Sequence, residues 1–178
     1  MVSHVEASCQ RGHPAVIGHS YGAVAVLWSA ARSPDIAALI APEPMSPFQD
    51  MVHRATFLLA RDPSRSFGER IGLRLASTRG VEEAVVPIYW LRTGIWMGSR
   101  TANTLSPLAS IGKRPTLFVA GAEDQICPPE NAQKMYRATR SPTKALLIIP
   151  GADHTSTFSS HPALCESTVI SFLQRVSR

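Results

Sequence analysis

The sequence PAVIGHSYGA at residues 14–23 joins a short apolar run to the start of a helical pattern. The run at residues 15–17 is apolar without alternation, as expected for a strand buried on both faces of a sheet. Apolar residues then recur at helical spacing: Ala23, Val26, Leu27 and Ala30. Ser20 therefore occupies the turn between a strand and a helix. Gly18 and Gly22 lie two residues to either side of it, and a sharp turn needs small residues at such positions.

Three further apolar runs occur along the chain, at residues 36–41, 116–120 and 145–149. Each run is continuous, which again indicates a strand covered on both faces. Helical patterns follow the run at 116–120 and the run at 145–149. Strands that alternate with helices predict an α/β fold, in which helices flank a mostly parallel sheet.

The segment between the second and third predicted strands carries no comparable strand pattern. Its apolar residues recur at helical spacing in two groups: Met51, Ala55, Leu58 and Leu59, then Phe67, Ile71 and Leu75. We therefore expect a core region at 1–44, a helical cap at 45–107 and a second core region at 108–178. Trp90 and Trp96 in the cap are either packing residues or part of a substrate pocket.

The composition is that of a globular protein, with 44% hydrophobic and 17% charged residues in a chain of 178. The net charge of +5 is spread along the chain without long basic runs, which argues against nucleic-acid binding. No signal peptide and no apolar stretch of membrane-spanning length is visible. Three cysteines without metal-ligand spacing, Cys9, Cys127 and Cys165, favour a reducing compartment, so we expect a cytoplasmic protein without metal or cofactor.

Acidic and basic groups follow the last two predicted strands. Asp124 comes after the third strand, and His154 comes after the fourth. Because the carboxyl ends of parallel strands share one edge of a sheet, both side chains should lie near Ser20. Two other carboxylates compete with Asp124 for the role of acid: Glu123 beside it, and Glu43 after the second strand.

Three neighbours of these residues are assigned other roles. Asp153 is interpreted as a turn residue. His19 is expected to point away from Ser20 and to pack beneath the turn. Cys127 lacks the helix start or strained turn that activates a cysteine nucleophile.

Three motifs carry a resemblance to a known family: IGHSYGA at 17–23, PTLFVAGAEDQICPP at 115–129 and IPGADH at 149–154. With these motifs the chain resembles the α/β-hydrolase family, in its cap-bearing, esterase- and lipase-like branch. The resemblance implies Ser20 as nucleophile, His154 as general base, Asp124 as orienting acid and the Tyr21 N–H as an oxyanion donor. It also implies that the four strands are the fifth to eighth of an eight-stranded sheet, so the N-terminal half of the sheet is lacking.

We therefore expect a serine hydrolase that cleaves a small-molecule carboxylic ester through an acyl-enzyme. One alternative is a partner-dependent or inactive half-domain without a complete oxyanion hole. Another keeps the fold and changes the reaction to amide or peptide cleavage, or to acyl transfer. The first strand would form an open apolar edge, which predicts a homodimer through that strand or poor solubility.

Overall fold

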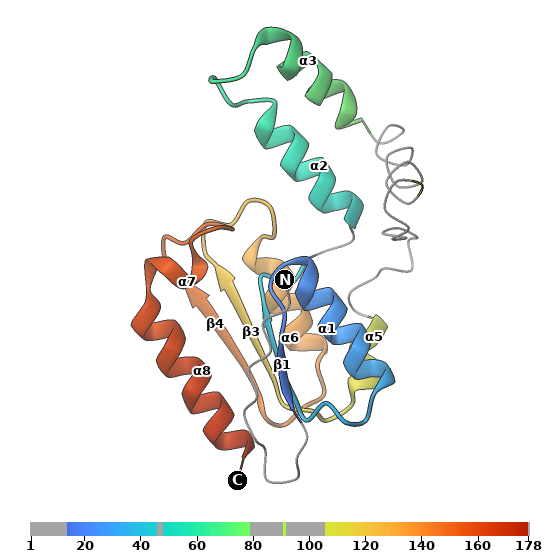
Figure 1. Cartoon of the computed structure of the whole chain (residues 1–178), viewed down its shortest axis with the longest axis vertical. Helices are drawn as coiled ribbons and strands as arrows, with labels where there is room; N and C mark the ends of the chain where they lie inside the picture. Colours follow the sequence, from blue (N-terminus) through green and yellow to red (C-terminus); the bar gives the residue numbers. More distant parts are fainter. Residues whose placement is uncertain (1–13, 46–47, 79–90, 92–105, 178) are drawn as a thin grey trace. The chain divides into compact units, whose positions relative to one another are not determined.

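The computed structural model of the chain describes residues 14–45, 48–78, 91 and 106–177 (Figure 1). A four-stranded parallel sheet forms its centre, and the strands lie in the sheet in their chain order. They are β1 (Ala15–Ile17), β2 (Ala38–Pro42), β3 (Thr116–Gly121) and β4 (Lys144–Ile149). The predicted α/β fold with a parallel sheet flanked by helices is confirmed.

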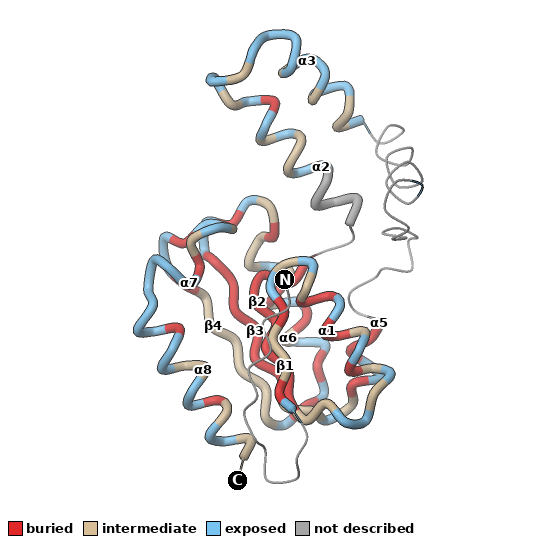
Figure 2. Tube along the Cα trace, viewed as in Figure 1, coloured by how far each residue is buried: buried red, intermediate tan, exposed pale blue. Residues whose placement is uncertain are grey.

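Helices connect the strands and cover both faces of the sheet. The helices around the sheet are α1 (Tyr21–Arg32), α5 (Ser106–Ile111), α6 (Pro129–Ala138), α7 (Thr157–Ser160) and α8 (Pro162–Val176). Residues of α1, α5 and α6 share one core cluster with the sheet, and residues of α8 share a second cluster on the opposite face (Figure 2). Among the described residues, no helix combines the length and the hydrophobicity that a bilayer crossing requires.

The two faces explain why the strand sequences are continuously apolar. In β3, Phe118 packs in the cluster with α1, α5 and α6, whereas Leu117 and Val119 pack in the cluster with α8. Successive side chains of a strand point to opposite faces, so a strand covered on both faces needs apolar residues at every position. The runs at 15–17 and 145–149 depart from this expectation, because Val16 and Ile17 in β1 and all of β4 except Ile149 are only half-buried. Both strands lie at the edges of the described sheet, which explains the difference.

The chain divides into two compact units, residues 1–45 with 104–178 and residues 46–103. The described part of the second unit contains α2 (Phe48–Leu59) and α3 (Phe67–Ala76), which contact each other. A capping box starts α3, in which the Ser66 side chain accepts from the Glu69 N–H and the Glu69 carboxylate accepts from the Ser66 N–H. Trp90 and Trp96 lie outside the described residues.

Strand β1 pairs with β2 on one side and forms an edge of the sheet within the described part of the chain. The Pro14 carbonyl and the Gly18 N–H both bond to the β2 side. Because alternate residues of a strand direct their backbone groups to opposite sides, those of Ala15 and Ile17 face the open side. We therefore expect β1 to pair with a second copy of the chain, or to make the chain poorly soluble.

Ala15→Pro tests this expectation, because proline removes the N–H that faces the open side and is tolerated at the first residue of an edge strand. We expect the variant to be monomeric and the parent dimeric in light scattering, with unchanged circular dichroism. Ile170→Lys is the control, because it places a charge on an exposed position of α8 and should leave the dimer intact. A parent chain that stays monomeric at high concentration would contradict the expectation.

Candidate functional site

Ser20 lies in the turn between β1 and α1, in a backbone conformation that is rare for a residue with a side chain. Its φ is 55° and its ψ is −115°, and such a conformation costs on the order of 1–3 kcal/mol. Two hydrogen bonds hold it: the Ser20 N–H donates to the Pro42 carbonyl at 2.9 Å, and the Ser20 carbonyl accepts from the Ala23 N–H at 3.0 Å. Tyr21 follows directly as the first residue of α1.

The turn requires a close approach of two backbone segments at Gly18. A Cβ atom added there would lie 2.2 Å from the Gly22 carbonyl oxygen, so no side chain fits. The expectation that small residues flank Ser20 is therefore correct for Gly18. Gly22 differs, because a Cβ atom added there meets nothing within 4 Å.

The loops after β3 and β4 supply a carboxylate and an imidazole. Asp124 is buried, and its Oδ1 accepts hydrogen bonds from the N–H groups of Ile126 and Cys127 at 2.8 and 2.7 Å. The two loops also touch through their backbones, since a Cβ atom added at Gly121 would lie 2.4 Å from the Ala152 carbonyl oxygen. This contact leaves little freedom between the loop that carries Asp124 and the loop that carries His154.

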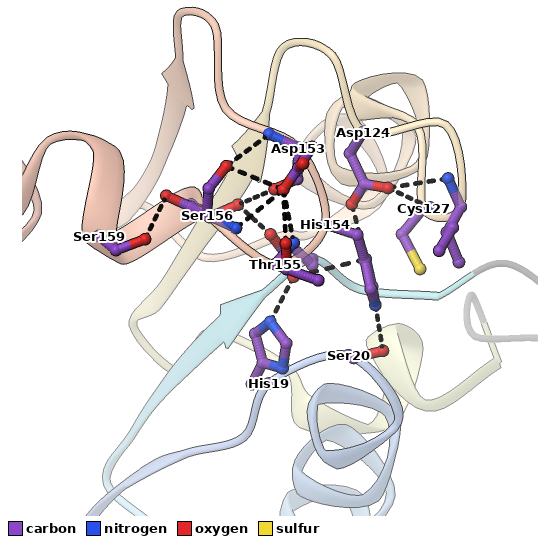
Figure 3. Close-up of polar contacts among 12 residues, drawn as sticks. His19, Ser20, Asp124, Cys127, Asp153, His154, Thr155, Ser156 and Ser159 are labelled. Carbon is purple, nitrogen blue, oxygen red and sulfur yellow. Dashed lines mark hydrogen bonds and ion pairs between the residues drawn. The ribbon is translucent and has the colours of Figure 1, made fainter. Parts of the chain in front are cut away.

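The structure brings Ser20, His154 and Asp124 into one hydrogen-bonded chain (Figure 3). His154 Nδ1 lies 2.8 Å from Asp124 Oδ2, and His154 Nε2 lies 3.1 Å from Ser20 Oγ. A carboxylate can only accept, so we assign the proton to Nδ1, which donates to Asp124. When the ring is neutral, Nε2 then accepts from the Ser20 hydroxyl.

The surroundings of His154 favour its charged form. The hydrogen bond to Asp124 raises the pKa of His154 above its ordinary value, and the neighbouring Cys127 sulfur acts in the same direction against the effect of burial. Burial raises the pKa of the Cys127 thiol, so this thiol stays protonated at neutral pH. Asp124 therefore dominates the electrostatics of the imidazole.

The other carboxylates occupy different surroundings. Glu123 is exposed, whereas Glu43 is fully buried with its Oε2 3.5 Å from His154 Nδ1. Asp124 makes the shorter contact, so the geometry favours Asp124 over both alternatives. Asp153 is confirmed as a turn residue, because its Oδ1 accepts from the N–H groups of Thr155 and Ser156.

The expectation that His19 packs beneath the turn is wrong. Its side chain is 52% exposed rather than packed beneath the turn, and its Nε2 pairs with Glu43 Oε2. The regular alternation of side chains ends with the strand, so it does not predict where a side chain of the following turn points. Thr157, whose hydroxyl donates to Glu43 Oε1, carried no signal in the sequence.

Among the described residues, one group could hold a metal ion: Asp124, Cys127 and His154. Each offers one ligand atom, and these atoms lie within 4.8 Å of one another. Carboxylate, thiolate and imidazole ligands suit Zn²⁺. The hydrogen bond between Asp124 and His154 already accounts for the placement of two of the three.

A parallel sheet flanked by helices, with a serine, an imidazole and a carboxylate at its carboxyl edge, is typical of α/β hydrolases. A family profile described as "Alpha/beta hydrolase family" matches residues 1–167. The chain belongs to the alpha/beta hydrolase family, as its sequence motifs indicate.

Known proteins are similar over parts of their length. The Pyrococcus furiosus esterase Pf2001 superposes with a TM-score of 0.65 at 22% identity, over 90% of this chain and 52% of that one. The esterase domain of a Rhodothermus marinus protein superposes with a TM-score of 0.58 at 22% identity, over 93% and 62%. The uncharacterized protein YfhR of Salmonella typhi is 34% identical over 68 residues, which are 38% of this chain and 23% of YfhR. The chain thus spans about half of the Pyrococcus esterase, and its 68 matched residues span about a quarter of YfhR.

The two glycines beside Ser20 give a matched pair of substitutions. Gly18→Ala should lower the free energy of unfolding by about 2 kcal/mol or more, because the new methyl group collides with backbone that cannot move away. Gly22→Ala lies in open space within α1 and should change stability by less than about 1 kcal/mol. Urea unfolding followed by circular dichroism compares them. Equal effects of the two substitutions would contradict the packing described for Gly18.

Asp124→Asn should lower the pKa of His154, because a neutral amide stabilises the imidazolium less than a carboxylate does. Titration of the His154 ring by NMR measures this directly. The raised pKa also implies that the imidazolium stabilises the fold. This contribution is complete below the ordinary histidine pKa and is lost as pH rises through the folded-state pKa, so it should shrink in the variant. An unchanged pKa would contradict the assigned hydrogen bond.

Proposed function

We propose that the protein is a serine hydrolase that cleaves carboxylic esters through an acyl-enzyme. The observation that carries the proposal is the hydrogen-bonded chain from Ser20 through His154 to Asp124. A serine hydroxyl is a weak nucleophile at neutral pH, and a neighbouring imidazole activates it by accepting its proton. The esterase neighbours support the fold in which such chemistry is placed.

In the first half-reaction Ser20 Oγ attacks the ester carbonyl carbon while His154 Nε2 takes the hydroxyl proton. The resulting imidazolium is stabilised by the Asp124 carboxylate at Nδ1. The tetrahedral intermediate collapses as His154 gives that proton to the leaving alcohol, which leaves an acyl group on Ser20. Water then attacks the acyl carbon with His154 again as base, and the carboxylic acid is released with Ser20 restored.

The Tyr21 N–H is the proposed donor to the tetrahedral oxyanion. Tyr21 follows Ser20 in the chain and begins α1, so the positive end of the helix dipole lies beside the reacting carbon. Loss of one oxyanion donor typically lowers turnover about 10²- to 10³-fold. The number of donors that the site offers therefore sets how fast the proposed reaction runs.

We further propose that residues 45–107 form a helical cap that favours small or medium acyl groups. The basis is the sequence of this segment, whose Met and Trp residues are of the kind that lines apolar pockets. Within its described part, α3 presents Phe67 and Leu75 as exposed apolar residues.

A fluorophosphonate should add one organophosphoryl group to Ser20, detected by mass spectrometry of the labelled peptide. Ser20→Ala and His154→Ala should lower hydrolysis of p-nitrophenyl esters about 10⁴- to 10⁶-fold, and Asp124→Asn about 10⁴-fold. Ser29→Ala is the control, because Ser29 is an exposed serine on α1 and should retain full labelling and turnover.

Two outcomes would overturn the proposal. A well-folded preparation that takes no label would mean that the chain is inactive without a partner. Faster cleavage of p-nitroanilides than of the matching esters would replace ester cleavage by amide cleavage.

A further inference from the structure

Glu43 is a buried carboxylate that the proposed reaction does not use. It follows β2 directly, is fully buried, and has a φ of 49°, in the left-handed region. The Glu43 N–H donates to the Val119 carbonyl at 2.7 Å, which fixes the backbone at this point. A buried charge is costly unless it is paired, so the partners of this carboxylate reveal what it does.

Three side chains surround the Glu43 carboxylate. The Thr157 hydroxyl donates to Oε1, and His19 Nε2 pairs with Oε2. The same Oε2 lies 3.5 Å from His154 Nδ1, too far for a good hydrogen bond but within the range in which two charges interact. Two carboxylates therefore flank Nδ1: Asp124 accepts its hydrogen bond, and Glu43 lies farther away on the same nitrogen.

His19 connects Glu43 to the turn that carries Ser20. It precedes Ser20 in the chain, and its ring centroid lies 5.6 Å from that of His154. Because His19 Nε2 contacts Glu43 Oε2, His19 and His154 approach the same carboxylate oxygen. A change at His19 should therefore reach His154 through Glu43.

We propose that His19 and Glu43 form a positioning pair. In this pair Glu43 stabilises the imidazolium form of His154, and His19 weakens this stabilisation by contacting the same carboxylate oxygen. The inference rests on the proposed function, because stabilising the imidazolium matters when His154 acts as the base. The titratable groups around the Glu43 carboxylate come from the segments that follow the four strands. They are His19 after β1, Glu43 after β2, Asp124 and Cys127 after β3, and His154 after β4. The carboxylate of Asp153 is directed to Thr155 and Ser156.

A merely structural role for the pair makes a different prediction. If Glu43 served only to tie the end of β2 to α7 through Thr157, its loss would lower stability and leave the titration of His154 unchanged. An electrostatic role predicts shifts of opposite sign for the two members of the pair. Removing the Glu43 charge destabilises the imidazolium, whereas removing His19 leaves the Glu43 charge to act on His154 alone.

The test is NMR titration of His154 in the full chain with four variants. Glu43→Gln should lower the pKa of His154 by about 1 pH unit, and His19→Ala should raise it. His19→Gln keeps a side-chain N–H donor for Glu43 and should lie closer to the parent than His19→Ala does. The double variant Glu43→Gln with His19→Ala should match Glu43→Gln alone, because His19 acts through Glu43.

The acid limb of the fluorophosphonate labelling rate should move in the same directions as these pKa values. Shifts of equal sign, or no shift, in Glu43→Gln and His19→Ala would overturn the proposal. His19 is half-exposed, so His19→Ala should fold even if Glu43→Gln does not, and it alone shows whether the pKa of His154 rises. The titration needs no turnover, so the expected shifts without labelling would leave the pair standing and refute the serine hydrolase.

Discussion

Parallel pairing of the four strands is the constraint on which the site depends. In a parallel sheet all strands end at the same edge, so the turns and loops after β1, β2, β3 and β4 meet there. Ser20 and His154 are 134 residues apart in the chain and are nevertheless joined by a hydrogen bond. The sheet thus brings together a hydroxyl, an imidazole and two carboxylates that lie far apart in the sequence.

Strained backbone conformations occur at the same edge of the sheet. Within the described ranges, Ser20 and Glu43 are the non-glycine residues with positive φ, and both lie just beyond a strand end. Their neighbouring hydrogen bonds link adjacent strands: the Ser20 N–H reaches the carbonyl of Pro42, and the Glu43 N–H reaches the carbonyl of Val119. The buried sheet holds both residues in conformations that an isolated peptide would rarely adopt.

The strands and the three residues Ser20, Asp124 and His154 could be placed from the sequence because their signals are local. Continuous apolar runs mark strands, and a polar residue after each run marks the carboxyl edge. The burial of an edge strand could not be predicted in this way. β4 is half-buried because it lies at an edge of the described sheet, and its apolar sequence does not indicate that position. The surroundings of Glu43 depend on Thr157, 114 residues away, so no pattern near residue 43 could show them.

The contact between Gly121 and Ala152 limits where this chain can accept an inserted residue. Since the backbones of the two loops touch where no Cβ fits, the segment between β3 and Asp124 cannot gain a residue without displacing the segment between β4 and His154. An insertion in this chain before Asp124 would therefore shift Asp124 relative to His154. The distance between acid and base therefore depends on the main chain at this contact as well as on the side chains of Asp124 and His154.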